Sequence, residues 1–201
     1  MLLYDLISMP YKEFVPVAWQ KYNESEYKGA TYVGNHLFDI PYDIEYKMQY
    51  PHLYDHNGQN EDTGIKGAER SGFQQHRFSQ DSDFVQEVKE YFQIDYIYCA
   101  INNLQHQMMT AMHFDLNRSA LIKYTPLEKQ KKILAEDKHR YIVFLQDQEM
   151  GQIFQVGEQY LSWKAGDIYS FPWYMPHCTA NCSAEDRFLL SVAGFVDPDT
   201  L

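Results

Sequence analysis

The sequence predicts a mostly β protein, built as a barrel or sandwich of short strands with a few supporting helices. The first observation is a series of short, closely spaced strand patterns from Ile94 to Phe195. The second is the small number of helical patterns among them. The third is composition, because 201 residues with 45% hydrophobic and 16% aromatic content can bury a sizeable core. We therefore expect one domain over residues 1–201.

Two regions differ in pattern, although no linker separates them. We expect residues 1–93 to be irregular and aromatic-rich and to supply supporting and substrate-region elements, with a turn-prone tract from His56 to Gly72. A helix capped at Asp81-Ser82-Asp83 should bury one apolar stripe against a sheet. That stripe consists of Phe84, Val85, Val88, Tyr91 and Phe92.

Residues 94–201 carry the strand core. The predicted strands are residues 94–101, 110–115, 119–124, 141–145, 152–156, 159–163, 167–171, 177–181 and 187–195.

Three residues in this core form a candidate metal-ligand group. His113 and Asp115 are two places apart in a predicted strand, where alternation puts both side chains on one face, roughly 6 to 7 Å apart. On a helix the same pair would not face one ion. His177 begins a later strand. Two histidines and one carboxylate are the set that holds non-haem Fe(II) with three open positions.

Alternation also assigns faces to the last two strands. In the strand from His177 to Asn181, His177, Thr179 and Asn181 should share a face, while Cys178 and Cys182 point the other way. In the final strand, we expect one face to carry a cation among small side chains, as a ligand-binding interior requires. The residues of that face are Arg187, Leu189, Ser191 and Ala193.

At these residues the chain resembles the Fe(II)- and 2-oxoglutarate-dependent oxygenases, and more broadly the cupin-like double-stranded β-helix (jelly-roll) proteins. The resemblance covers roughly residues 94–195 and rests on the order His113-x-Asp115, His177, and Arg187 ten places later. Residues 166–181 also resemble the second cupin signature, but the first is missing, because Asp115 stands where a second histidine would be expected. This favours the oxygenase over a generic cupin.

The resemblance implies a reaction and a site. His113, Asp115 and His177 would hold Fe(II), and 2-oxoglutarate and O2 would take its open positions. Arg187 would bind the distal carboxylate of 2-oxoglutarate, and we expect Ser191 and Asn181 to assist, although oxygenases often carry the serine where Leu189 stands. The implied reaction hydroxylates an unactivated C–H bond of a small molecule or peptidyl side chain, releasing succinate and CO2.

Two alternatives remain open at this point. One is a cupin-type metal enzyme, an isomerase or dioxygenase, that does not use 2-oxoglutarate. Succinate release would separate the two enzymes. The other is a non-catalytic binding domain on the same scaffold. A thiolate zinc site at Cys178 and Cys182 is not expected, because no second cysteine pair exists.

Charge and termini limit the partners. The chain has 17 basic against 28 acidic residues, a net charge of −11, and no basic block longer than residues 129–132, so we do not expect it to bind nucleic acid.

No apolar run is long enough for a membrane span, and no signal peptide is recognisable at Met1. Three cysteines, an odd number, fit reduced thiols, so we expect a cytoplasmic protein. The sequence does not indicate an oligomeric state.

Overall fold

The strands of the computed structural model follow the predicted pattern closely. The model describes residues 1–41, 59–60, 65–66, 73–115, 123 and 125–200. Its strands are β1 (Thr31–Asn35), β2 (Gln59–Asn60), β3 (Ile65–Lys66), β4 (Phe73–Arg77), β5 (Tyr96–Leu104), β6 (Met108–His113), β7 (His139–Phe144), β8 (Gln152–Val156), β9 (Gln159–Tyr160), β10 (Asp167–Ser170), β11 (His177–Asn181) and β12 (Arg187–Phe195).

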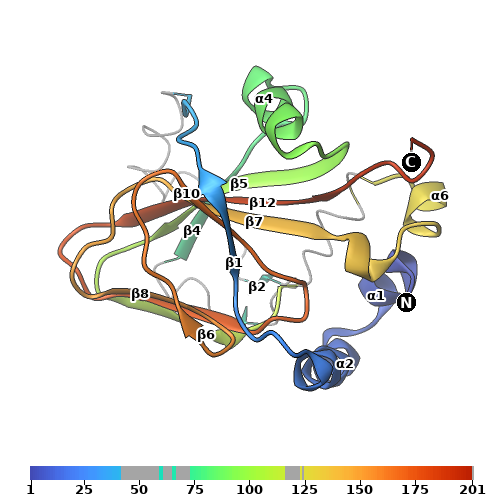
Figure 1. Cartoon of the computed structure of the whole chain (residues 1–201), viewed down its shortest axis with the longest axis horizontal. Helices are drawn as coiled ribbons and strands as arrows, with labels where there is room; N and C mark the ends of the chain where they lie inside the picture. Colours follow the sequence, from blue (N-terminus) through green and yellow to red (C-terminus); the bar gives the residue numbers. More distant parts are fainter. Residues whose placement is uncertain (42–58, 61–64, 67–72, 116–122, 124, 201) are drawn as a thin grey trace.

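These strands form two facing antiparallel sheets (Figure 1). The larger has the order β1-β10-β7-β12-β5-β4, and the smaller has the order β6-β11-β8-β9, while β2 pairs only with β3. Of the eight strands from β5 to β12, the larger sheet contains β5, β12, β7 and β10, in that order. The smaller sheet contains β6, β11, β8 and β9. This order is that of an eight-stranded jelly roll. The predicted mostly β, double-stranded β-helix fold is confirmed.

Three predicted strands have the expected bounds, and the others are shifted or shorter. β5 begins two residues later than predicted, and β6 and β7 each begin two residues earlier. β8, β11 and β12 begin and end at the predicted residues. β9 ends at Tyr160 rather than at residue 163, although Leu161 and Trp163 remain buried in the core beyond the paired segment. Most of the strand predicted over residues 119–124 and most of the turn-prone tract from His56 to Gly72 lie outside the described residues.

The expectation that residues 1–93 are irregular is wrong for the first half of that segment. Two helices, α1 (Leu3–Ser8) and α2 (Tyr11–Glu24), precede β1. Pro16 lies inside α2, and an internal proline ordinarily argues against a helix. β1 pairs with β10 and β4 pairs with β5, so this segment supplies both edge strands of the larger sheet. The division at residue 93 stays a prediction.

The predicted amphipathic helix is α4 (Asp83–Phe92), which lies on the side of the larger sheet away from the smaller one (Figure 1). Ser82 caps it, with its hydroxyl accepting a hydrogen bond from the backbone N–H of Val85. Phe84, Val85 and Val88 are buried, as predicted. Tyr91 is 43% exposed, so the buried stripe is narrower than predicted. Its ring stacks on His36 instead, at a centroid distance of 4.5 Å.

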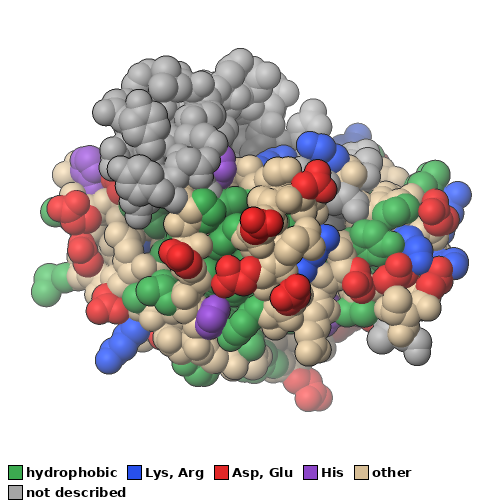
Figure 2. All heavy atoms as spheres, turned by 90° about the horizontal axis from the view of Figure 1, so that it is seen from above, with side chains coloured by type: hydrophobic (Ala, Val, Ile, Leu, Met, Phe, Trp, Pro, Cys, Tyr) green, Lys and Arg blue, Asp and Glu red, His purple; other side chains and the backbone are tan. Residues whose placement is uncertain are grey.

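An apolar cluster fills the space between the two sheets. It contains residues of both sheets, namely Ile142, Phe144, Phe154, Val156 and Leu189 among others. A short helix, α6 (Leu127–Gln130), lies near α1 and the C-terminus (Figure 1). No helix in the described part of the chain is long and apolar enough to cross a membrane. Figure 2 shows acidic side chains spread across the described part of the face seen from the α4 side.

Candidate metal centre

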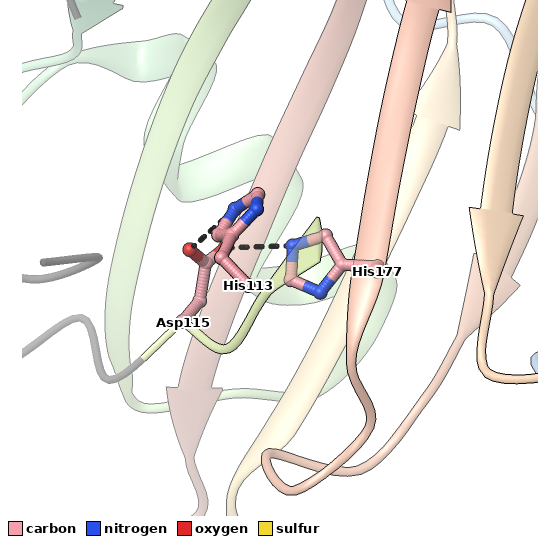
Figure 3. Close-up of side chains that lie close together, drawn as sticks. All are labelled: His113, Asp115 and His177. Atoms are coloured by element: carbon pink, nitrogen blue, oxygen red, sulfur yellow. Dashed lines mark ion pairs between the residues drawn. The ribbon is translucent and has the colours of Figure 1, made fainter. Parts of the chain in front are cut away.

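The three predicted ligands meet in the structure (Figure 3). His113 is the last residue of β6, His177 is the first residue of β11, and Asp115 follows β6 by two residues. One ligand atom from each lies within 4.8 Å of the others. The Nε2 atoms of His113 and His177 lie 3.3 and 3.4 Å from the two carboxylate oxygens of Asp115. Neighbouring ligands bound at about 2.1 Å to one ion would be about 3.0 Å apart, so these two distances are close to those of a metal site.

The local backbone differs from the predicted regular strand. His113 pairs with His177 while Thr110 pairs with Thr179, so β6 carries one extra residue between these pairs. Regular alternation from the buried Thr110 would turn His113 away from the interior. The bulge returns the His113 side chain to the His177 side, which is a common use of bulges near functional sites. Asp115 does not share a strand face with His113, because β6 has already ended.

Hydrogen bonds to the backbone orient both imidazoles. His113 Nδ1 lies 2.7 Å from the carbonyl oxygen of Ala111, and His177 Nδ1 lies 3.2 Å from that of Met175. A carbonyl can only accept, so each ring satisfies this contact as the Nδ1–H tautomer. Both Nε2 lone pairs then remain for a metal ion, and the contacts fix the ring orientations.

The surroundings keep His177 and Asp115 in their metal-binding protonation states. Burial, with the nearby His113 and Arg140, lowers the pKa of His177 to about 4, so the ring is neutral at pH 7. Burial alone would raise the pKa of Asp115. The positive charge of Arg140 outweighs this effect and holds the pKa of Asp115 well below its usual value. A neutral imidazole and an ionised carboxylate are the forms that coordinate metals.

Arg140 is a site residue that the sequence analysis missed. Its Nη2 contacts Asp115 Oδ2 and lies 3.3 Å from His177 Nε2. The side chain is 4% exposed and lies over the Phe171 ring, 4.6 Å from the centroid. The predicted strand begins at Tyr141, two residues after the start of β7, and so leaves Arg140 out. In β7, Arg140 alternates in phase with the buried Ile142 and Phe144, and an arginine in phase with core residues was the available signal.

The donor set fits a resident divalent ion. Two imidazole nitrogens and one carboxylate leave open coordination positions and suit a non-haem Fe(II) site. His177 is buried and His113 and Asp115 are half-buried, and two outer contacts fix the orientations of the histidine rings, as metal sites ordinarily do. Cys178 lies on the opposite side of β11 from His177 and is partly exposed, as alternation predicted, whereas Cys182 follows the end of β11 and is exposed.

Arg187 begins β12 and is 2% exposed between the two sheets. Its Nη1 donates to the backbone oxygen of Ile153 at 3.2 Å, whereas its Nε has no hydrogen-bond partner among the described residues. The guanidinium lies 5.6 Å from the Phe154 ring centroid and 5.9 Å from that of Trp163. Phe154 in turn stacks on His177, with ring centroids 6.3 Å apart. Through this ring, Arg187 and the ligand group line one interior.

The other predicted co-substrate residues are also buried. Ser191 is 5% exposed. From β12 it pairs with Ala100 of β5 on one side and with Ile142 of β7 on the other, so it lies on the inner face of the sheet, as predicted. Asn181 is fully buried on the same side of β11 as His177. Its amide nitrogen donates to the carbonyl oxygens of Leu104 and Glu185 at 2.9 and 2.8 Å. These contacts show a structural role for Asn181, and co-substrate binding by Ser191 and Asn181 stays a prediction.

Comparison with solved structures gives matches of low sequence identity. KdgF from Halomonas sp. matches with a TM-score of 0.38 and 9% identity over 65% of this chain and 86% of that one. A cupin-superfamily sugar phosphate isomerase from Silicibacter pomeroyi matches with a TM-score of 0.36 and 10% identity, covering 61% and 59% of the two chains. Oxalate decarboxylase from Lactobacillus farciminis matches with a TM-score of 0.37 and 15% identity over 62% of this chain, which spans only 29% of that protein.

Two further comparisons found nothing: no family model and no curated protein matches the sequence.

Proposed function

We propose that this protein is an Fe(II)- and 2-oxoglutarate-dependent oxygenase that hydroxylates an unactivated C–H bond. The observation that carries the proposal is the ligand group of His113, Asp115 and His177, which shares one buried interior with Arg187. A facial set of this kind supports Fe(II) with open positions, and a buried cation beside it supports a carboxylate-bearing co-substrate.

The protein's own residues supply binding and orientation. His113, Asp115 and His177 would hold the ion, and the backbone contacts of both rings would keep their Nε2 atoms directed at it. Bound Fe(II), with 2-oxoglutarate and O2, would supply the oxidising chemistry that yields the hydroxylated product, succinate and CO2. The jelly-roll interior would exclude competing reactions.

Arg187 is the proposed clamp for the distal carboxylate. Burial lowers its pKa to about 10, so the side chain remains a cation at neutral pH. A buried cation without an anionic partner is costly, and a bound carboxylate would remove that cost. The unpartnered Nε can donate to such a carboxylate, and the planar guanidinium allows paired, charge-assisted hydrogen bonds. Ser191, on the same strand face, is proposed to add a hydroxyl donor.

The substrate class follows from the proposed chemistry. We propose a small molecule or a peptidyl side chain, and we do not propose nucleic acid, given the net charge of −11. Specificity would arise from residues 1–93 and from the loops at the mouth of the jelly roll.

A second candidate is a cupin-type metal enzyme that does not use 2-oxoglutarate. The cupin-like signature over residues 166–181 favours it. In this candidate His113, Asp115 and His177 would still hold the metal ion, and Arg187 would bind a different anionic group.

Succinate formation separates the two candidates. Protein supplied with Fe(II), 2-oxoglutarate and ascorbate should release succinate, and the rate should rise when the correct substrate is added from a panel of amino acids, peptides and small polar metabolites. Asp115→Ala should abolish the release. Wild-type protein that binds iron and releases no succinate with any member of the panel, or without substrate, would favour the cupin-type enzyme.

A further inference from the structure

Arg140 contacts the same ligand atoms that a metal ion would use. We propose that Arg140 competes with the metal ion for Asp115 and His177, and that metal binding turns its guanidinium toward a carboxylate bound at the ion. The inference rests on the proposed metal site and adds a residue that couples metal affinity to an anionic ligand.

The competition follows from the available lone pairs. Arg140 Nη2 lies 3.3 Å from His177 Nε2, whose Nδ1 already faces the carbonyl of Met175. A neutral imidazole has one acceptor nitrogen, so His177 Nε2 can accept from Arg140 or coordinate an ion, but not both. The same guanidinium nitrogen contacts Asp115 Oδ2. A metal ion therefore has to displace Arg140 from two of its three protein ligands.

Burial prevents the displaced guanidinium from simply moving into water. Arg140 is 4% exposed, its guanidinium lies over Phe171, and its Nε has no hydrogen-bond partner among the described residues. A buried cation that loses its carboxylate partner is costly until another acceptor replaces it. Arg140 therefore needs a second anion once Asp115 is committed to the metal.

The class of that anion follows from charge and shape. A divalent ion, the Asp115 carboxylate and the Arg140 guanidinium together leave two net positive charges at the site. A carboxylate on the open metal positions reduces this excess and can accept two parallel hydrogen bonds from a planar guanidinium. Metal and carboxylate should therefore bind cooperatively through Arg140, each raising the affinity for the other by the same factor.

Calorimetric titration with Mn(II), a redox-stable probe, tests the proposal. Arg140→Met removes the charge but keeps an unbranched side chain, and should bind Mn(II) alone about tenfold or more tightly than wild type, because a competing cation beside the ion is gone. Saturating 2-oxoglutarate should tighten Mn(II) binding in wild type and have a much smaller effect in Arg140→Met. Arg140→Lys keeps the charge and should retain the weaker, wild-type affinity for Mn(II) alone.

Arg187→Met is the matched control. It also replaces a buried arginine on the inner face of the larger sheet, but Arg187 contacts none of the three ligand residues in the described structure. Its affinity for Mn(II) without 2-oxoglutarate should equal that of wild type. Weaker or unchanged Mn(II) binding in folded Arg140→Met would overturn the inference and show that Arg140 only orients Asp115. No Mn(II) or Fe(II) binding by wild type would instead contradict the proposed function.

A measurement on wild-type protein does not depend on how the variants fold. The 15N signal of the Arg140 Nε–H group should shift when diamagnetic Zn(II) is added, and shift again with 2-oxoglutarate. A signal that stays unchanged through both additions, at stoichiometric metal, would overturn the inference.

Discussion

His113 and His177 lie directly opposite each other on β6 and β11, with ring centroids 4.3 Å apart. This pairing exists because β6 carries one extra residue after Thr110, which returns the His113 side chain to the interior. The two rings come from chain segments 64 positions apart in sequence number (177 minus 113), so only the folded protein presents them together.

Bound metal should therefore stabilise the fold. An ion at a hundred times its dissociation constant contributes about 2.7 kcal/mol, which for a chain of this size corresponds to a rise of about 5 to 10 °C in melting temperature. Thermal unfolding with and without Fe(II) or Mn(II) measures it. His177→Ala should abolish the rise, whereas Cys178→Ala, the next residue on the opposite side of β11, should keep it. A rise of equal size in both variants would place the ion elsewhere.

Asn181 should contribute to the stability of the fold. Its side-chain nitrogen donates hydrogen bonds to two backbone carbonyl oxygens, and its side-chain oxygen accepts one from the Ser183 hydroxyl at 2.7 Å. The Asn181 side chain is fully buried. Asn181→Ala should lower the free energy of unfolding by about 2 to 4 kcal/mol, because buried partners lose their hydrogen bonds. Denaturant unfolding measures the loss. An apparent requirement for 2-oxoglutarate that rises tenfold in this variant would support a co-substrate role instead.

Stability should depend on Asp197 in acid. The hydrogen bond from Lys129, with that from the backbone of Asp199, lowers the pKa of Asp197 from 3.8 to about 2. The folded state therefore binds this proton less readily than the unfolded state, so the contribution is present above pH 3.8 and is lost as the pH falls through 2. The stability difference between wild type and Asp197→Asn, followed by circular dichroism, should shrink over this range. A difference that stays constant down to pH 2 would contradict the assignment.

Arg187→Ala should raise the apparent requirement for 2-oxoglutarate by roughly thirtyfold or more. Truncating one partner of a buried charge pair costs about 2 to 5 kcal/mol, and each 1.4 kcal/mol is a factor of ten. Metal binding should be nearly unchanged, because Arg187 is not a ligand. Rates of succinate formation at increasing 2-oxoglutarate measure the requirement, with Arg187→Lys as the charge-retaining control. If the rate depends on 2-oxoglutarate equally in Arg187→Ala and in wild type, Arg187 does not bind the distal carboxylate.

Local patterns were sufficient to predict much of the core and of the metal group. Strict alternation predicted β11 and β12 with their bounds, and with them the inward positions of His177 and Arg187. Alternation could not predict the bulge in β6, because one extra residue leaves no mark in the hydrophobic pattern. Asp115 joins the site through that bulge and the segment after the strand, not through a shared face.

Other features depend on contacts between distant segments. The predicted strand begins at Tyr141 and so leaves Arg140 out, and only the fold shows that the partner of Arg140 is Asp115. The helix α2 contains Pro16, and local propensity alone argues against a helix there. Packing overrides that propensity, because Phe14 and Ala18 of the helix are fully buried.

The most direct test of the central claim is the anaerobic absorption spectrum of the protein with Fe(II) and 2-oxoglutarate. If His113, Asp115 and His177 hold the ion with positions open for the co-substrate, a visible charge-transfer band of the chelated complex should appear in wild type and weaken in Asp115→Ala. Wild-type protein that binds iron stoichiometrically yet shows no band at saturating 2-oxoglutarate would contradict the oxygenase and leave a metal enzyme of another kind.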